Sequence, residues 1–185
     1  MSCHPVSPPH TSIRQVWRGA RGRDGALTHV PLIARPNLLD VGAGNGLLPS
    51  MVEAGYDPSR LTGIDYSQFS VDLCTAIAKR RNGAEDEEKH ACENATFAVC
   101  DFLDPESPVP PPSKESTSDG VWDLVLDKGT LDAISLMDRD EQGVAPLERY
   151  VPRVVRLLRP GGYFLITCER LSSASFHKFI PTHSV

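Results

Sequence analysis

The chain has 185 residues and a formal net charge of −5. With 40% hydrophobic and 23% charged residues, it has the composition of a folded globular domain and not of a fibrous or disordered chain. This length is enough for one hydrophobic core but not for a second full domain. The acidic balance disfavours nucleic acid as a specific partner. No apolar stretch approaches the roughly 18 residues of a membrane span, and none resembles a secretory signal.

The cysteines indicate a reducing compartment. They are Cys3, Cys74, Cys92, Cys100 and Cys168. Their number is odd, no two of them form a Cys-x-x-Cys pair, and no histidine stands at zinc-ligand spacing. We therefore expect a cytoplasmic protein that holds no metal.

Residues 1–36 form a segment of different character, with several prolines and little apolar periodicity, and we expect it to be poorly ordered. Within it, residues 11–23 combine four arginines with apolar residues at helical spacing and contain no acidic residue. This pattern is typical of a loosely docked basic tail, which we favour, or of a mitochondrial targeting peptide.

From residue 37 onward, the pattern alternates between strands and helices. The expected strands are residues 37–41, 61–65, 95–100, 121–127 and 163–168. The expected helices are residues 47–54, residues 67–81 with Ser67 as the N-cap, and a helix that begins near Pro146 or begins again at Pro152. Residues 104–120, rich in proline and serine, are expected to form a solvated loop. The alternation predicts an α/β fold: a Rossmann-like, mostly parallel sheet with helices on both faces and ligands at the carboxyl ends of its strands.

A glycine-rich turn follows the first predicted strand. Its residues are Asp40, Val41, Gly42, Ala43, Gly44, Asn45 and Gly46. Glycines at this place permit a tight turn and let a ligand approach the backbone closely. Leu47 stands where a dinucleotide fingerprint requires glycine, and the Gly-Lys-Ser/Thr of a phosphate-binding loop is absent from the sequence. The turn therefore fits an acidic-x-Gly-x-Gly-x-Gly motif, although such turns also serve helix packing.

Acidic residues also follow the second and third predicted strands. Asp65 and Tyr66 come after the second strand, where a carboxylate can accept both hydroxyl groups of a ribose. The alternative is that Asp65 helps to cap the following helix. Asp101 and Phe102 follow the third strand and place an acceptor for an adenine amine beside an apolar ring. Asp-Phe after a strand is common in loops and is a weak signal by itself. Together with Asp40, however, three acidic residues stand at three successive strand ends, and this order and spacing strengthen the interpretation as a ligand site.

The most specific segment is residues 122–134, with the run Asp127, Lys128, Gly129, Thr130, x, Asp132 at the end of the fourth strand. Together with the glycine-rich turn and the run Leu-Leu-Arg-Pro-Gly-Gly at 157–162, it resembles the seven-stranded S-adenosylmethionine (SAM) methyltransferases. The similarity is greatest to the elongation factor 1-alpha lysine methyltransferase 2 family, and it covers about residues 37–170.

This resemblance implies a SAM-dependent protein-lysine N-methyltransferase of the cytoplasm that acts on elongation factor 1-alpha. Residues 37–170 would form the SAM-binding domain, followed by an unmatched tail at 171–185. The residues that would bind SAM are Asp40, Gly42, Ala43, Gly44, Gly46, Asp65, Tyr66, Asp101, Phe102 and Asp127. Asp127 would also orient the acceptor amine, and Lys128 would hold the loop or contact an acidic surface of the substrate.

Two alternatives stay open, because cofactor motifs do not encode the acceptor. One is a SAM-dependent enzyme with another acceptor, and the other is a catalytically silent module that binds SAM or a partner protein. The match ends before the strands that would complete a seven-stranded sheet. We therefore expect an incomplete sheet in which the strand at 163–168 is an edge, and a monomer at risk of association through that edge.

Overall fold

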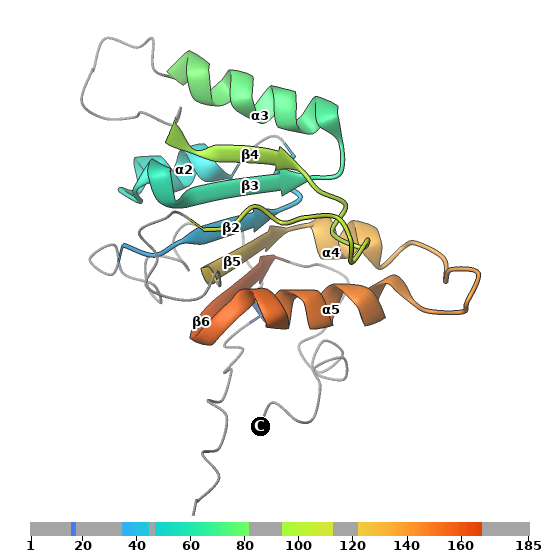
Figure 1. Cartoon of the computed structure of the whole chain (residues 1–185). Helices are drawn as coiled ribbons and strands as arrows, with labels where there is room; N and C mark the ends of the chain where they lie inside the picture. The colour runs from blue at the N-terminus through green and yellow to red at the C-terminus, as the bar shows by residue number, and fades with distance from the viewer. Residues whose placement is uncertain (1–15, 18–34, 45–46, 82–93, 113–121, 168–185) are drawn as a thin grey trace, which may run out of the picture.

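The computed structural model describes residues 16–17, 35–44, 47–81, 94–112 and 122–167 (Figure 1). The strands are β1 (Val16–Trp17), β2 (Leu38–Val41), β3 (Leu61–Asp65), β4 (Thr96–Val99), β5 (Trp122–Lys128) and β6 (Leu158–Thr167). The helices are α2 (Leu48–Glu53), α3 (Gln68–Arg81), α4 (Thr130–Ile134), α5 (Pro146–Leu157) and the short 3₁₀ helix η2 (Pro58–Arg60).

The six strands form one sheet in the order β1-β6-β5-β2-β3-β4, and every neighbouring pair is parallel. This confirms the predicted Rossmann-like α/β class. From β2 the chain runs outward through β3 to β4, and then crosses to β5 on the other side of β2. Such a reversal of strand order leaves a crevice at the carboxyl ends of the central strands, which is the usual ligand position in open α/β sheets.

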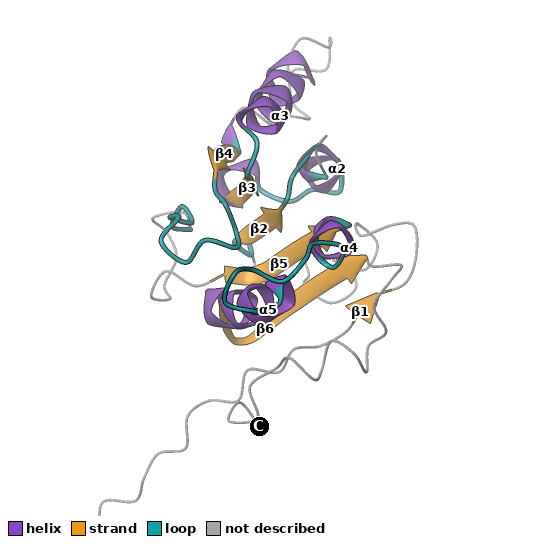
Figure 2. Ribbon diagram, turned by 90° about the vertical axis from the view of Figure 1, so that its right-hand side faces the viewer, coloured by secondary structure: helices purple, strands orange, loops and turns teal. Residues whose placement is uncertain are grey.

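Helices cover both faces of the sheet, because strands buried on both sides need apolar cover on each. On one face, α2 packs over β2, β3 and β5 through Leu48, Met51 and Val52. On the other, α4 and α5 form a larger core with the same strands and β6, which includes Trp122, Tyr150 and Phe164. Figure 2 shows α4 and α5 in front of β5 and β6.

From residue 37 onward, the predicted elements agree with the structure in order and type, with several differences. Strand β6 begins at Leu158, five residues before the predicted strand, and the short helix η2 was not predicted. Helix α5 begins at Pro146 and continues through Pro152, at the expense of one backbone hydrogen bond. Helix α4 was not predicted. Residues 104–112 are not simply a solvated loop as expected, since Pro112 is buried and Val109 packs against the core. Residues 113–120 lie outside the described residues.

The expectation that the last predicted strand is a sheet edge is wrong at its carboxyl end. Val16 and Trp17 pair with Ile166 and Thr167 as β1. This pair also shows that two residues of the predicted poorly ordered segment form a strand, not part of a helix. Residues 1–15 and 18–34, and the tail at 171–185, lie outside the described residues. No described helix has the length and apolar character to span a membrane.

Candidate functional site

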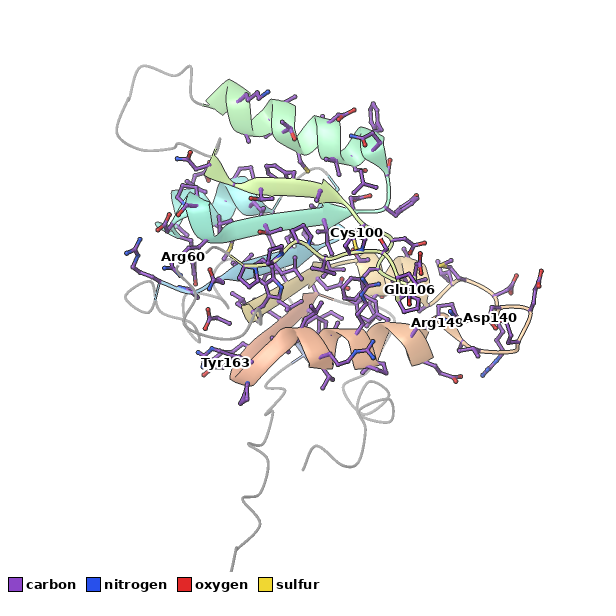
Figure 3. The ribbon with its side chains drawn as sticks, viewed as in Figure 1. Arg60, Cys100, Glu106, Asp140, Arg149 and Tyr163 are labelled. Atoms are coloured by element: carbon purple, nitrogen blue, oxygen red, sulfur yellow. The ribbon has the colours of Figure 1, made fainter. Side chains whose placement is uncertain are left out.

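A cavity of about 400 Å³ opens at the carboxyl ends of β2, β3 and β4. Its lining residues are Val41, Gly42, Ile64, Asp65, Tyr66, Cys100, Asp101, Phe102, Leu103, Thr130, Ala133, Ile134 and Met137. They form a mostly apolar wall with a few polar groups, as in small-molecule sites of about 300–1,000 Å³. Cys100 lies at the end of the sheet that holds the carboxyl ends of the strands, and Arg60 lies at the opposite end (Figure 3).

The glycine-rich turn forms the floor of the cavity beside β2. The amides of Gly42 and Ala43 both donate to the carbonyl oxygen of Ile64, at 2.8 and 2.9 Å, so the turn is fixed to β3. Gly42 and Gly44 have positive φ angles of 69° and 52°. A Cβ atom on Gly42 would lie 1.9 Å from the Thr130 hydroxyl, whereas one on Gly44 would meet no described atom closer than 3.7 Å. Gly42 thus allows α4 to pack on the turn. At Gly44 the amide and the carbonyl are bonded to Asp65 and Cys74, and only the Cβ position is free of close contacts with described atoms.

Asp65 joins the turn to the start of α3. One carboxylate oxygen accepts a hydrogen bond from the Gly44 amide at 3.0 Å, and the other accepts one from the Ser67 amide at 2.9 Å. Ser67 itself caps α3 by accepting from the Ser70 amide. The side chain therefore does contribute to the helix start, as the alternative held, and it also lines the cavity. Each oxygen keeps a second lone pair for a ligand hydroxyl.

The wall after β4 consists of Asp101, Phe102 and Leu103. Asp101 is exposed, and its carboxylate accepts from the Leu103 amide at 2.9 Å. Phe102 is buried and packs against the Tyr150 ring of α5 at 5.1 Å between ring centroids. Tyr66 stands at the mouth of the cavity with 80% of its surface exposed.

Asp127 ends the buried part of β5 and is only 1% exposed. Its carboxylate accepts from the amides of Thr130 at 2.9 Å and Leu131 at 3.0 Å, and from the Tyr150 hydroxyl. It therefore fixes the first turn of α4, which has no side-chain cap of its own. Burial raises the pKa of Asp127 to about 6, against the opposing effect of these hydrogen bonds.

Asp40 lies under the turn, buried on β2 opposite Leu126, which precedes Asp127 on the neighbouring strand β5. One of its carboxylate oxygens has no hydrogen-bond partner among the described residues. Burial, together with the negative charge of Asp127, raises the pKa of Asp40 to about 7. Two carboxyl groups beneath the site thus have pKa values that burial raises.

The structure brings half of the predicted cofactor residues to the cavity wall. Those that line it are Gly42, Asp65, Tyr66, Asp101 and Phe102. Asp40, Ala43 and Gly44 build the turn beneath it, and Gly46 lies outside the described residues. Neither Asp127 nor Lys128 is a lining residue, and the Lys128 side chain is exposed. The oxygens of Asp127 point to α4 and Tyr150, so this geometry supports a positioning role and not direct contact with an acceptor.

Sequence reasoning missed the wall that α4 supplies. Thr130, Ala133, Ile134 and Met137 line the cavity opposite the β4 side. Thr130 also donates from its hydroxyl to the Val41 carbonyl oxygen at 2.8 Å, which ties α4 to β2. The signal was available in part, because Thr130 belongs to the most specific run of the sequence, but its role follows only from the three-dimensional contact with Gly42.

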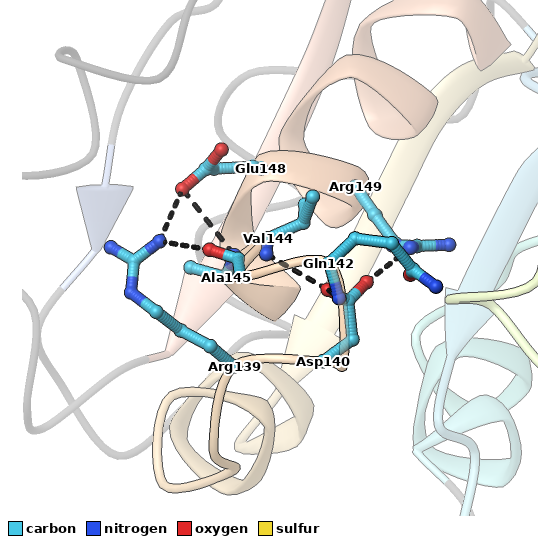
Figure 4. A network of polar contacts seen from close by, with 8 residues as sticks. Arg139, Asp140, Gln142, Val144, Ala145, Glu148 and Arg149 are labelled. Atoms are coloured by element: carbon cyan, nitrogen blue, oxygen red, sulfur yellow. Dashed lines mark hydrogen bonds and ion pairs between the residues drawn. The ribbon is translucent and has the colours of Figure 1, made fainter.

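A second, acidic groove of about 550 Å³ adjoins the cavity and shares Asp101, Leu103 and Met137 with it. Its outer side is the loop between α4 and α5, shown in Figure 4. Arg139 contacts the Gly143 carbonyl at 2.6 Å and Glu148 at 3.2 Å, and Asp140 accepts from Val144 at 2.8 Å and pairs with Arg149. These contacts hold the loop in place. The described residues contain no group of three or more side chains suited to hold a metal ion.

Comparison with known proteins places this geometry in a family. A family model described as a methyltransferase domain matches residues 35–179. The chain belongs to this methyltransferase domain family. The match includes every described residue of β2 to β6, and hence both walls of the cavity.

The chain is also similar in sequence to individual methyltransferases. EEF1A lysine methyltransferase 2 of Danio rerio is 35% identical over 131 residues, which cover 70% of this chain and 46% of the relative. Protein-lysine N-methyltransferase efm4 of Schizosaccharomyces pombe is 35% identical over 142 residues, covering 70% of this chain and 50% of the relative. The chain thus spans about half the length of these curated relatives.

A solved structure agrees in fold. The glycopeptide N-methyltransferase MtfA complexed with SAM superposes with a TM-score of 0.52 at 19% identity, over 88% of this chain and 59% of the other. At this identity, the likeness supports the methyltransferase fold and not a shared substrate.

Proposed function

We propose that this chain binds SAM in the cavity and transfers its methyl group to a lysine side chain of elongation factor 1-alpha. The observation that carries the cofactor assignment is Asp65, a carboxylate fixed by two backbone amides at the end of β3 and facing the cavity. The open space over Gly44 fits a ligand that lies against the backbone. The acceptor assignment rests on the similarity to the lysine methyltransferases.

In this proposal, the residues of the cavity bind the two ends of the adenosine. Asp65 would accept from the ribose hydroxyls, and Tyr66 lies next to it at the mouth. Asp101 would accept from the adenine amine, with the apolar ring of Phe102 beside it. Asp40, Ala43, Gly44 and Gly46 would support the methionine portion. When bound, SAM supplies an electrophilic methyl group, and holding it against an acceptor can account for much of the rate acceleration.

A lysine acceptor must lose its proton before its nitrogen can accept a methyl group. An apolar environment lowers a lysine pKa, whereas a nearby carboxylate raises it. The acidic groove beside the cavity suits the approach of a positively charged segment, since Asp101, Asp104 and Asp138 line it.

The test of this function is transfer of radiolabelled methyl from SAM to purified elongation factor 1-alpha, with SAM binding measured by calorimetry on the same preparation. We expect saturable binding and label that is recovered as N-methyl-lysine after hydrolysis of the substrate. Binding of SAM without transfer of label to elongation factor 1-alpha, or to any protein when a cell lysate is supplied instead, would favour the silent module. Label in a small molecule, or in another protein only, would favour the alternative acceptor.

Asp65→Ala is expected to weaken SAM binding by about 2–4 kcal/mol, because charge-assisted hydrogen bonds to the ribose are lost. It also leaves the Gly44 and Ser67 amides without their acceptor. Asp65→Asn, which keeps one oxygen acceptor, should bind with intermediate affinity. Calorimetry with both variants checks this, and an affinity within twofold of the wild type for Asp65→Ala would restrict Asp65 to its capping role.

A further inference from the structure

Arg153 of α5 is a buried arginine whose partners all lie on the segment that follows β4. Only 8% of the surface of Arg153 is exposed. The guanidinium donates to the carbonyl oxygens of Asp101 and Phe102, each at 3.2 Å, and to those of Asp104 and Ser107. A buried cation needs such partners, because burial without them is very costly.

The same guanidinium lies over the face of Phe102, with 4.9 Å from its central carbon to the ring centroid. Phe102 and its neighbours Asp101 and Leu103 are the β4 wall of the cavity. Among the described residues, none of those in α5 lines the cavity. Arg153 therefore contacts the outer side of a wall whose inner side faces the site.

We propose that Arg153 is a positioning residue, which holds residues 101–107 as a fixed wall and thereby sets Asp101 and Phe102 against the adenine ring of SAM. This role rests on the proposed function, because it presupposes that the cavity holds the adenosine. The proposal goes beyond that function because it names a residue that favours adenine without contacting it. Arg153 does so by holding the backbone carbonyl groups of the wall.

Arginine is suited to this role because its planar fork carries five N–H donors on three nitrogens. One terminal nitrogen of Arg153 contacts three carbonyl groups, and the other contacts the Ser107 carbonyl. A lysine offers a single nitrogen with three donors and cannot reach the same set. An apolar side chain of similar length fills the space without holding the carbonyls, and the loss of this donor from buried acceptors has a cost in stability.

The test uses the full chain and two ligands that differ only in the base, S-adenosylhomocysteine and S-inosylhomocysteine. The first offers an amine to Asp101 and the second a carbonyl oxygen. We expect the wild type to prefer the adenine compound by about tenfold or more, the discrimination of one good hydrogen bond. Arg153→Met should reduce this preference to within about twofold, and Arg153→Lys should give an intermediate value. Arg156→Met, on the exposed side of the same helix, is the matched control and should keep the preference.

The ratio separates positioning from folding, because a general loss of stability lowers both affinities together. If Arg153→Met does not fold, Ser107→Ala tests the same wall, since the Ser107 hydroxyl accepts from the Asp101 amide at 3.0 Å; it should lower the preference several-fold. An unchanged ratio in the folded variant, or in Ser107→Ala where only that variant folds, overturns the role of Arg153. A wild-type chain that binds neither compound overturns the proposed function itself.

Discussion

Gly42→Ala is expected to destabilise the fold by about 2–5 kcal/mol, whereas Gly44→Ala should cost only about 1 kcal/mol. Both glycines have positive φ angles, so both substitutions carry the strain of an L-residue in the left-handed region. Only the Cβ atom on Gly42 would overlap another side chain, at 1.9 Å from the hydroxyl oxygen of Thr130. Relief of that overlap requires α4 to move from the turn, and with it one wall of the cavity.

Urea denaturation of the two single variants measures this difference directly. The double variant Gly42→Ala with Thr130→Gly removes the overlapping side chain and should regain part of the lost stability. SAM affinity should show the reverse order and fall more in the Gly44 variants than in Gly42→Ala. The reason is that the Cβ atom of Gly44→Ala, or the larger side chain of Gly44→Val, enters the space left for SAM. Equal loss of stability in Gly42→Ala and Gly44→Ala would contradict the assigned contact with Thr130.

Strands β2 to β5 were predictable because each is a short apolar run with a turn or helix signal behind it, whereas β1 was not predicted and β6 begins five residues before the predicted strand. The second predicted strand coincides with β3, and Ser67 and the residues behind it coincide with the start of α3. The alternation of these elements was enough to predict the parallel sheet and the edge that binds ligands. It was also enough to predict that Asp65 and Asp101 lie at the same site.

What the sequence did not disclose depends on contacts between distant residues. Helix α4 has only five residues, and the side chain that holds its first turn is Asp127, outside the helix. Neither Tyr150 nor Arg153 belongs to a recognisable motif, because their partners lie 23 residues and about 50 residues away. The described part of the loop rich in proline and serine, residues 104–112, is irregular as predicted, but its composition gives no sign that a buried arginine fixes it.

These two contacts give α5 a common role in the site. Through Tyr150 and Asp127 it supports α4, and through Arg153 it supports the segment after β4. The two walls of the cavity are therefore held by one helix that does not itself reach the ligand space. Because the Phe102 and Tyr150 rings are in contact, the supports are also joined to each other. A substitution in either support should thus disturb cofactor binding before it disturbs any step of methyl transfer.

Asp127 allows the strongest test of this arrangement. Asp127→Ala is expected to cost about 3–5 kcal/mol of stability, because the Thr130 and Leu131 amides and the Tyr150 hydroxyl lose a buried acceptor together. SAM affinity and methyl transfer should then fall in parallel, as α4 no longer holds its wall. Asp127→Asn keeps one oxygen for the amides and an NH₂ group that can donate to the Tyr150 oxygen, so it should lose much less.

The pH dependence of Asp127→Asn provides an independent check. Burial raises the pKa of Asp127 from 3.8 to about 6, so between these values the folded state holds a proton that the unfolded state has released. The contribution of this carboxyl group to stability is therefore greatest at low pH and decreases as the pH rises to about 6, by a difference on the order of 3 kcal/mol. Asparagine does not titrate, and the stability lost in Asp127→Asn should be larger near pH 4 than near pH 7. Denaturation of both proteins across this range measures the difference. If Asp127→Ala instead binds SAM as the wild type does and only transfer is lost, the carboxylate acts on the acceptor and the positioning role is wrong.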